Sequence, residues 1–372
     1  MDHSSGLGWS ELRINSVIKS LEVRNFTAFS EARLCFTEGL NVIVGENGTG
    51  KTHLLKLPYA VMAVSAEESR RHGDDRQPTK TFLQTQVAEK IVNVFRPEES
   101  RLGRLVRRQQ GRNRCEVRVN FRRHETSIGF NFASQSKSEV VMDLLPSKWV
   151  DYMPVFLPPR ELLTIYPGFI SLYETHNVEF EETWRDTCLL LGSPTVRGPR
   201  GKVVTSMLGA LEEQIGQVAL ERNGRFYLKQ SGLGAGSMEM PLVAESWRKL
   251  AMLARLITTG ALLDQGALFW DEPESNLNPR LIREVAKAIL RICNAGVQVF
   301  VATHSLFLLR EFEILAKHEE FERVKQRYFA LSRVEDGGAE ISQSSDIDGV
   351  EPLLLLDEEL EQSDRFLKVF MP

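Results

Sequence analysis

Short alternating runs of apolar and polar residues dominate the beginning of the chain. Two such runs lie within residues 17–36, and the apolar run Asn41–Val44 follows them. Alternation with a period of two is typical of strands with one buried face, whereas a continuous apolar run is typical of a strand buried on both faces. We therefore predict antiparallel strands that lead into a buried strand.

Helical spacing of apolar residues takes over after this strand. Residues 53–66 and 81–95 have this spacing, and both segments are predicted to be helices. Residues 67–80 between them are charged and rich in turn-forming residues, which predicts a surface loop. Two alternating runs within residues 115–132 predict a small inserted antiparallel hairpin. The apolar run Val155–Leu157, closed by two prolines, predicts a short buried strand.

The second half of the chain begins with mixed helical segments and ends in a regular alternation. Residues 224–230 and the run MPLV at 240–243 predict a second hairpin around a glycine-rich turn, and residues 246–258 predict a helix. The next three segments read as strand, helix and strand, at residues 267–270, 279–293 and 297–302. Asn278 is the expected N-cap of the predicted helix, with Pro279 in its first position. This alternation predicts a parallel α/β core.

A phosphate-binding loop is the strongest motif. Residues 45–52 read GENGTGKT, a full GxxxxGK[ST] pattern between a predicted buried strand and a predicted helix. Glycines allow backbone N–H groups to surround phosphates at a helix N-terminus. Lys51 would contact the β and γ phosphates, and the Thr52 hydroxyl would bind Mg²⁺. A glycine-rich turn with a chance lysine is the alternative, and the flanking elements disfavour it. The residues predicted to bind ATP are Gly45, Glu46, Asn47, Gly48, Thr49, Gly50, Lys51 and Thr52.

Two carboxylates follow the apolar run of residues 267–270. An apolar run that ends in Asp-Glu is by itself weak, because many strands end in a solvated acidic turn. Together with a phosphate-binding loop it is typical of a Walker B strand. Asp271 is then the predicted Mg²⁺ residue, and Glu272 would polarise the attacking water.

Composition limits the classes of protein that fit. The 372 residues carry a net charge of -4, so the chain as a whole does not attract nucleic acid. The four cysteines have no spacing typical of a zinc site and are expected to be reduced thiols in the cytoplasm. The N-terminus lacks a signal-peptide pattern, and no apolar stretch approaches the roughly 18 residues of a membrane helix. A role in transport would need a separate membrane subunit.

The sequence after the Walker B strand resembles ABC-type ATPases. Residues 271–279 read DEPESNLNP, which is similar to the Walker B and D-loop of that family, and the next predicted strand ends in Thr303-His304-Ser305. The resemblance implies that His304 is the switch histidine that contacts the γ-phosphate. A histidine at a strand end is more often a solvated loop residue, and its place one strand beyond Walker B favours the functional interpretation.

The signature motif of this family is altered in the chain. Residues 243–249 read VAESWRK, with Ala244 in place of the usual serine and Ser246 in place of the usual glycine. The resemblance implies that Ala244, Glu245 and Ser246 face the nucleotide of a second subunit. Ala244 lacks the hydroxyl that would bind the γ-phosphate, so weaker ATP-driven dimerisation is expected. Arg160 stands near the expected switch-glutamine position, where a structural salt bridge is an equal alternative.

The beginning of the chain narrows the resemblance. The runs LEVRNF at residues 21–26 and NVIVGENG at 41–48 are similar to the SMC and RecF group and to bacterial AAA15/AAA21-type ATPases. SMC proteins insert a long coiled coil before the signature motif, and no heptads occur in that interval here. The compact RecF-like or defence-type relatives are therefore the better fit.

An arginine-rich segment is the candidate nucleic-acid contact. Residues Arg101 to Arg123 include nine arginines and one acidic residue, Glu116, with Phe121 as a candidate stacking ring for a base. A solvated face, or a docking site for the acidic C-terminal segment, is an equal alternative. That segment contains the leucine run Leu353–Leu356, so it is predicted to be docked on the body.

These features together predict one ABC-type ATPase domain over residues 15–372. The expected fold is α/β, a RecA-like parallel core with an N-terminal antiparallel sheet, a helical signature lobe and an inserted β-hairpin region. Its expected parts are a nucleotide-binding core at 15–60 and 260–335, an insertion with the basic segment at 67–145, a helical signature lobe at 160–260 and an acidic segment at 345–372.

The resemblance implies a head-to-tail homodimer, or a higher oligomer, that closes on ATP and Mg²⁺ and separates after hydrolysis. The expected uses are bacterial phage defence with a separate nuclease or toxin effector, and DNA maintenance with DNA or RNA as a partner. A slow nucleotide-gated clamp is one alternative, because the signature motif is altered. The ATPase subunit of a transporter is another, and the N-terminal sequence disfavours it.

Overall fold

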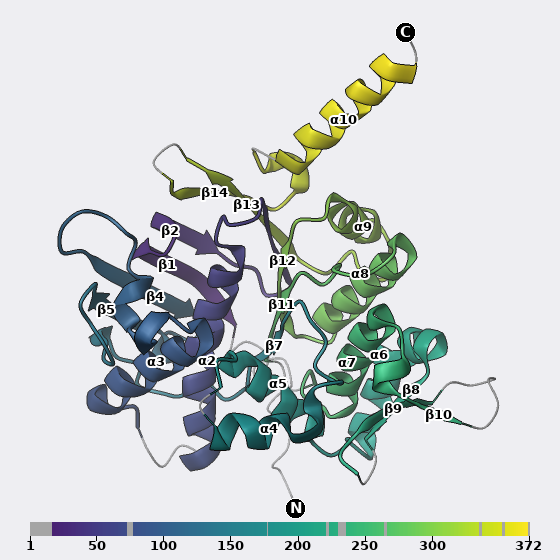
Figure 1. Ribbon diagram of the computed structural model, residues 1–372, viewed down its shortest axis with the longest axis horizontal. Coiled ribbons are helices and arrows are strands. Elements are labelled where there is room, and N and C mark those ends of the chain that lie inside the picture. Colours follow the sequence, from purple (N-terminus) through teal and green to yellow (C-terminus); the bar gives the residue numbers. More distant parts are fainter. Residues whose placement is uncertain are drawn as a thin grey trace, which may run out of the picture.

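The computed structural model describes residues 17–72, 77–176, 178–220, 223–229, 236–263, 266–334, 337–351 and 354–370. A six-stranded sheet lies at the centre (Figure 1). Its strands, in order across the sheet, are β14 (Ala339–Ser344), β13 (Gln326–Arg333), β3 (Leu40–Gly45), β12 (Gln298–Thr303), β11 (Ala267–Asp271) and β7 (Val155–Leu157).

Five strands of this central sheet run parallel, and β14 is antiparallel to β13. Every residue of β3, β7, β11 and β12 is buried. Burial on both faces explains why these strands read as continuous apolar runs in the sequence. The prediction of a parallel α/β core is confirmed.

A five-stranded antiparallel sheet forms beside the central sheet. Its strands, in order, are β2 (Phe29–Cys35), β1 (Ile18–Phe26), β4 (Arg114–Phe121), β5 (Ile128–Ala133) and β6 (Val141–Leu144). The predicted hairpin of residues 115–132 is β4 and β5, and β4 pairs along its length with β1. The hairpin therefore completes the N-terminal sheet.

Two helices fill the space between these sheets. Helix α2 (Lys51–His72) and helix α3 (Lys80–Phe95) share one core with both sheets. The prediction of a loop from Glu67 was wrong, because α2 continues to His72. Its basic last turn favours the negative end of the helix dipole, and Glu67 and Glu68 have cationic partners. Residues 73–76 of the predicted loop lie outside the described part of the chain.

The opposite face of the central sheet is covered by a second core. Its helices are α4 (Tyr166–Thr175), α5 (Glu182–Gly192), α6 (Pro199–Ile215), α7 (Glu245–Thr258), α8 (Pro279–Asn294) and α9 (Leu306–Ala316). In the described segments, none of the helices combines the length and apolar character needed to cross a membrane.

A three-stranded antiparallel sheet lies beside these helices, with the order β10 (Ser237–Glu239), β9 (Phe226–Lys229) and β8 (Gln217–Leu220). The prediction that residues 240–243 form a strand was wrong, because residues 240–242 are a short 3-10 helix. Pro241 has no N–H to donate to a ladder, so the strand that pairs with β9 ends at Glu239.

Helix α10 (Leu354–Phe370) projects from the end of the molecule that carries β13, β14 and α9 (Figure 1). All its side chains described, from Glu358 to Phe370, are exposed. An ion pair of 3.0 Å joins Glu359 of this helix to Arg310 of α9. The leucine side chains on which the docking prediction depended lie outside the described residues, and the described side chains of this helix are not buried against the body.

Candidate active site

The phosphate-binding loop joins β3 to α2. Its Gly48 and Gly50 have φ of 81° and 96°, in the left-handed region that favours glycine. A Cβ at Gly50 would lie 2.8 Å from the ring of Phe29, so the turn between β1 and β2 presses directly on the loop. The Thr49 hydroxyl donates to the Glu46 carbonyl at 2.9 Å. The loop is therefore held in a tight conformation at the N-terminus of a long helix, a geometry suited to phosphate.

Lys51 folds back over this loop. Its Nζ donates to the carbonyl oxygens of Gly45 and Glu46, both at 2.8 Å. Burial lowers the pKa of Lys51, and the nearby carboxylates of Glu272 and Asp271 oppose that effect. The ammonium is thus held in place by main-chain oxygens that an anion would supplement.

Thr52 and Asp271 are in contact at the edge of the sheet where β3 and β11 both end. The Thr52 hydroxyl donates to Oδ2 of Asp271 at 2.8 Å, whereas the buried Oδ1 has no hydrogen-bond partner. Burial raises the pKa of Asp271 to about 6, although the Thr52 hydrogen bond lowers it. One hydroxyl and one carboxylate with an unused oxygen fit a Mg²⁺ ion, which takes oxygen ligands.

Glu272 and His304 lie side by side after two neighbouring strands. Asp271 of β11 pairs with Ala302 of β12, and Oε1 of Glu272 lies 3.3 Å from Nδ1 of His304. Glu272 has φ of 47°, an uncommon left-handed conformation for a residue with a side chain. The structure therefore brings together the two residues predicted to carry catalysis.

Glu274 orders the segment that contains His304. Its carboxylate is buried, and Oε1 accepts a hydrogen bond from the Thr303 hydroxyl at 2.6 Å and from the His304 N–H at 3.2 Å. The sequence placed Glu274 in the Asp-Glu-Pro-Glu motif without giving it this role. The carboxylate fixes the main chain after β12, and with it the base of the histidine side chain.

The predicted signature residues lie at the N-terminus of α7. Helix α7 begins at Glu245, Ala244 is its N-cap without a side-chain hydrogen bond, and Ser246 is partly buried. Glu245 accepts a hydrogen bond from Asn276 at 3.0 Å, between β11 and α8. The first turn of α7 is thus joined to the segment that follows Glu272, whereas the loop of residues 45–50 lies at the start of another helix, α2.

Two family models match different parts of the chain. The AAA ATPase domain family (AAA_15) matches residues 17–144, which contain the phosphate-binding loop. The family described as "AAA domain, putative AbiEii toxin, Type IV TA system" (AAA_21) matches residues 208–310, which contain Glu272 and His304. Both models are of AAA-type ATPases, to which the chain is similar over these two stretches.

Solved structures of SMC heads share the fold of this chain. An SMC head bound to the C-terminal winged-helix domain of ScpA is 12% identical, with a TM-score of 0.54 over 89% of this chain and 98% of that chain. An SMC head with an extended coiled coil, bound to the C-terminal domain of ScpA from Pyrococcus furiosus, is 11% identical, with a TM-score of 0.50 over 96% of this chain and 100% of that chain. Among curated proteins, none matches the chain.

Arg333 lies at the phosphate-binding loop and was not predicted from the sequence. Its guanidinium on β13 donates to the Asn47 carbonyl at 2.5 Å, and a Cβ at Gly48 would lie 2.8 Å from the same guanidinium. The sequence gives no signal for this contact, because Arg333 lies in β13, after the last recognisable motif of the chain. At the switch-glutamine position, Arg160 is exposed, and the neighbouring Glu161 forms an ion pair of 3.2 Å with Arg248.

The arginine-rich segment is partly engaged with its own surroundings. Four of its arginines form ion pairs, namely Arg101 with Glu99, Arg104 with Glu98, Arg122 with Glu38 and Arg123 with Glu125. Phe121 is only 1% exposed, so its predicted role as a stacking ring was wrong. Alternation along β4 turns this ring into the core. Contact of the segment with nucleic acid stays a prediction.

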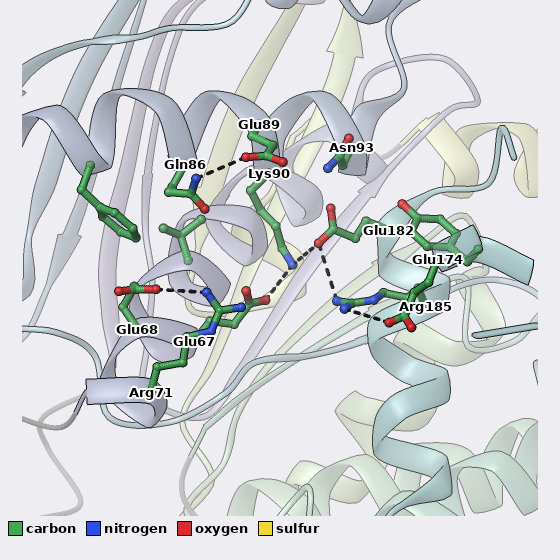
Figure 2. A pocket seen from close by; sticks show the side chains of 13 residues that line it. Glu67, Glu68, Arg71, Gln86, Glu89, Lys90, Asn93, Glu174, Glu182 and Arg185 are labelled. Atoms are coloured by element: carbon green, nitrogen blue, oxygen red, sulfur yellow. Dashed lines mark hydrogen bonds and ion pairs between the residues drawn. The ribbon is translucent and has the colours of Figure 1, made fainter. Parts of the chain in front are cut away.

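A buried cluster of charges connects three helices (Figure 2). Nζ of Lys90 on α3 lies 2.9 Å from Glu67 of α2, and 2.8 and 2.7 Å from Glu182 and Asp186 of α5. The Tyr59 hydroxyl of α2 donates to Asp186 at 2.8 Å. Burial alone would lower the pKa of Lys90, but the three carboxylates outweigh that effect and raise it.

The carboxylates of this cluster have the spacing of a metal site. Their ligand oxygens all lie within 4.8 Å of one another. Lys90 supplies the positive charge at their centre. Arg185, which also lines the pocket in Figure 2, forms a second ion pair with Glu182. The cluster is therefore an ion-paired junction between the helix of the phosphate-binding loop and the helical lobe.

Proposed function

We propose that the chain binds and hydrolyses ATP, and that ATP acts as a conformational switch. The observation that carries the proposal is the convergence of four side chains at one edge of the central sheet. Thr52 and Asp271 are 2.8 Å apart, and Glu272 and His304 are 3.3 Å apart. Ligands of α/β sheets bind at the carboxyl ends of the strands, where these residues lie.

The proposed roles follow from the positions of the side chains. The N–H groups of the loop and Lys51 bind the phosphates. Thr52 and Asp271 hold Mg²⁺, which when bound would offset charge on the β and γ phosphates. The Glu272 carboxylate accepts a hydrogen bond from the attacking water, and His304 contacts the γ-phosphate while Glu272 fixes its ring.

The second subunit of the proposed head-to-tail dimer would present the N-terminus of its α7 to this nucleotide. The amides of that helix end favour an anion. Ala244 offers no hydroxyl there, whereas Ser246, two residues further along, does. The lost hydroxyl favours slow turnover, so a nucleotide-gated clamp is the second candidate function.

The proposed biological use is a switch in phage defence or DNA maintenance that controls a separate effector. The AAA_21 description names the AbiEii toxin of type IV toxin–antitoxin systems, which supports a defence role. In the described part of the chain, the carboxylates spaced for a metal ion surround Lys90. Because Lys90 occupies the centre of that cluster, the proposed effector is a separate protein.

The test is ATP hydrolysis by the wild type and by Glu272→Gln, with and without single-stranded and duplex DNA. The amide keeps the size of the side chain but cannot accept a proton. We expect Glu272→Gln to bind ATP and to hydrolyse it at least about a hundredfold more slowly. Glu319→Gln, an exposed residue of the same type, is the matched control. A wild type that binds ATP and never hydrolyses it would refute the enzyme proposal and favour the clamp.

A further inference from the structure

Lys249 is a buried cation with no role in the mechanism described so far. It lies on α7, one turn after Glu245, and is 2% exposed. Its Nζ donates to the Glu272 carbonyl at 2.5 Å, to the Ser275 hydroxyl at 2.5 Å and to the Ser275 carbonyl at 3.4 Å. An ammonium group has three donors, and these three neutral oxygens use all of them.

Such a site is costly for a positive charge. Burial lowers the pKa of Lys249 to about 8, while Glu274, Glu272 and Asp271 oppose the effect from further away. Within the described residues, Lys249 forms no ion pair with a carboxylate. The cost of removing the ammonium from water offsets much of the energy of its hydrogen bonds. The main effect of Lys249 is therefore to fix the positions of the oxygens that it binds.

The segment that Lys249 holds has an unusual backbone. Glu272 and Asn276 have φ of 47° and 62°, and both lie between β11 and α8. A non-glycine residue in this region costs roughly 1 to 3 kcal/mol and persists only where its surroundings fix it. The carbonyl of Glu272 accepts from Lys249 and also from the Ser275 N–H at 3.1 Å. Rotation of that peptide would redirect the Glu272 side chain away from His304.

Both ends of the strained segment are joined to the first turns of α7. Lys249 holds Glu272 and Ser275, and Glu245 holds Asn276 at 3.0 Å. The Ser275 hydroxyl in turn donates to the Pro159 carbonyl at 3.1 Å, just after β7. A displacement of the N-terminus of α7 is therefore passed to Glu272 through hydrogen bonds that span one helical turn.

We propose that Lys249 is a positioning residue that sets the direction of the Glu272 carboxylate and couples it to the N-terminus of α7. The inference rests on the proposed role of Glu272. It explains how contact with a second subunit at Ala244 and Ser246 would reach the attacking water, without a direct contact between α7 and the nucleotide of the same chain.

The first test separates positioning from simple stabilisation. Lys249→Met keeps the volume of the side chain and removes its donors. Lys287→Met on α8 is the control, since that lysine is 32% exposed and pairs with Glu284 of its own helix at 3.1 Å. We expect Lys249→Met to lower kcat by about 10- to 100-fold, as displaced catalytic groups do, with KM for ATP changed less than about threefold. Lys249→Arg, which keeps donors, is expected to recover part of kcat.

A double-mutant cycle identifies the route. If Lys249 acts through Glu272, then adding Lys249→Met to Glu272→Gln lowers kcat no further. Independent, multiplicative losses would overturn the proposal. So would a Lys249→Met variant with a lowered melting temperature and an unchanged kcat well below it, because that pattern is a structural role alone.

A readout without turnover keeps the inference distinguishable from the proposed function. The ring signals of His304 in NMR spectra, assigned with His304→Gln, report the position of the adjacent Glu272 carboxylate. We expect these signals to move in Lys249→Met in the direction seen in Glu272→Gln, and to stay in place in Lys287→Met. Movement without any ATP hydrolysis in the wild type would refute the proposed enzyme and leave the positioning role standing, whereas unmoved signals would overturn the positioning role.

Discussion

Replacement of Lys90 by methionine is the most informative perturbation of the fold. The change removes one cation that lies 2.7 to 2.9 Å from three carboxylates, on a side chain that is 5% exposed. Loss of one partner of a buried ion pair costs about 3 to 5 kcal/mol. Because Glu67 is 28% exposed and can rehydrate, we expect the lower end, about 3 kcal/mol, a large part of a typical total of about 5 to 15 kcal/mol.

Urea unfolding followed by circular dichroism measures this loss. Lys287→Met is again the matched control, because Lys287 is 32% exposed and pairs with Glu284 one turn away on the same helix, a kind of pair worth about 0.2 to 0.5 kcal/mol. Equal destabilisation of the two variants would refute the reasoning, since it would mean that the three carboxylates need no cation.

The same variant should bind a divalent cation. Without Lys90, Glu67, Glu182 and Asp186 leave carboxylate oxygens within 4.8 Å of one another, and Ca²⁺ prefers such ligands. We expect millimolar Ca²⁺ to raise the melting temperature of Lys90→Met and not that of the wild type. A deficit independent of Ca²⁺ would contradict the charge argument.

Two further predictions concern the site and the helix that follows it. Burial raises the pKa of Asp271 to about 6, and only the ionised carboxylate binds Mg²⁺. Mg²⁺ titrations in the presence of ATP should therefore show the affinity falling about tenfold per pH unit below about pH 6. An affinity for Mg²⁺ that is the same from pH 7 to pH 5 would contradict the assignment. Asn278 caps α8 by accepting a hydrogen bond from the Leu281 N–H at 3.0 Å. Asn278→Ala should therefore lower the free energy of unfolding by about 1 kcal/mol, and Asn278→Asp should restore it. Equal stability of all three proteins would show that the cap is not needed.

The central strands and the site residues could be predicted because their signals are local. Burial on both faces makes β3, β11 and β12 continuous apolar runs, and each run ends where its chemistry begins. Parallel strands place those ends at one edge, which is why Glu272 and His304 meet although they lie on different strands.

The charged junctions could not be predicted, because their partners come from distant parts of the chain. Lys90 and Asp186 are 96 positions apart. In the sequence, a helical lysine has the same pattern of neighbours whether its side chain is solvated or surrounded by buried carboxylates. Lys249 was part of the altered signature stretch, but its contact depends on the turn taken after β11. The end of α2 was misjudged for a similar reason, since Glu67 and Glu68 look like loop residues until their partners are known.

The position of β3 has a consequence for how the chain reaches its native state. This strand lies between β12 and β13, and the Asn41 amide donates to the Val299 carbonyl across 258 positions of sequence. Ribosomes add about 5 to 20 residues per second, so β3 emerges roughly 10 to 50 s before either neighbour exists. During that interval the antiparallel sheet of residues 18–144 can assemble, because all its strands have been synthesised, while both edges of the phosphate-binding strand stay unpaired. Chaperone contact during synthesis is therefore expected to concentrate on residues 40–45, and the late arrival of β12 and β13 makes the nucleotide site the last part of the molecule to mature.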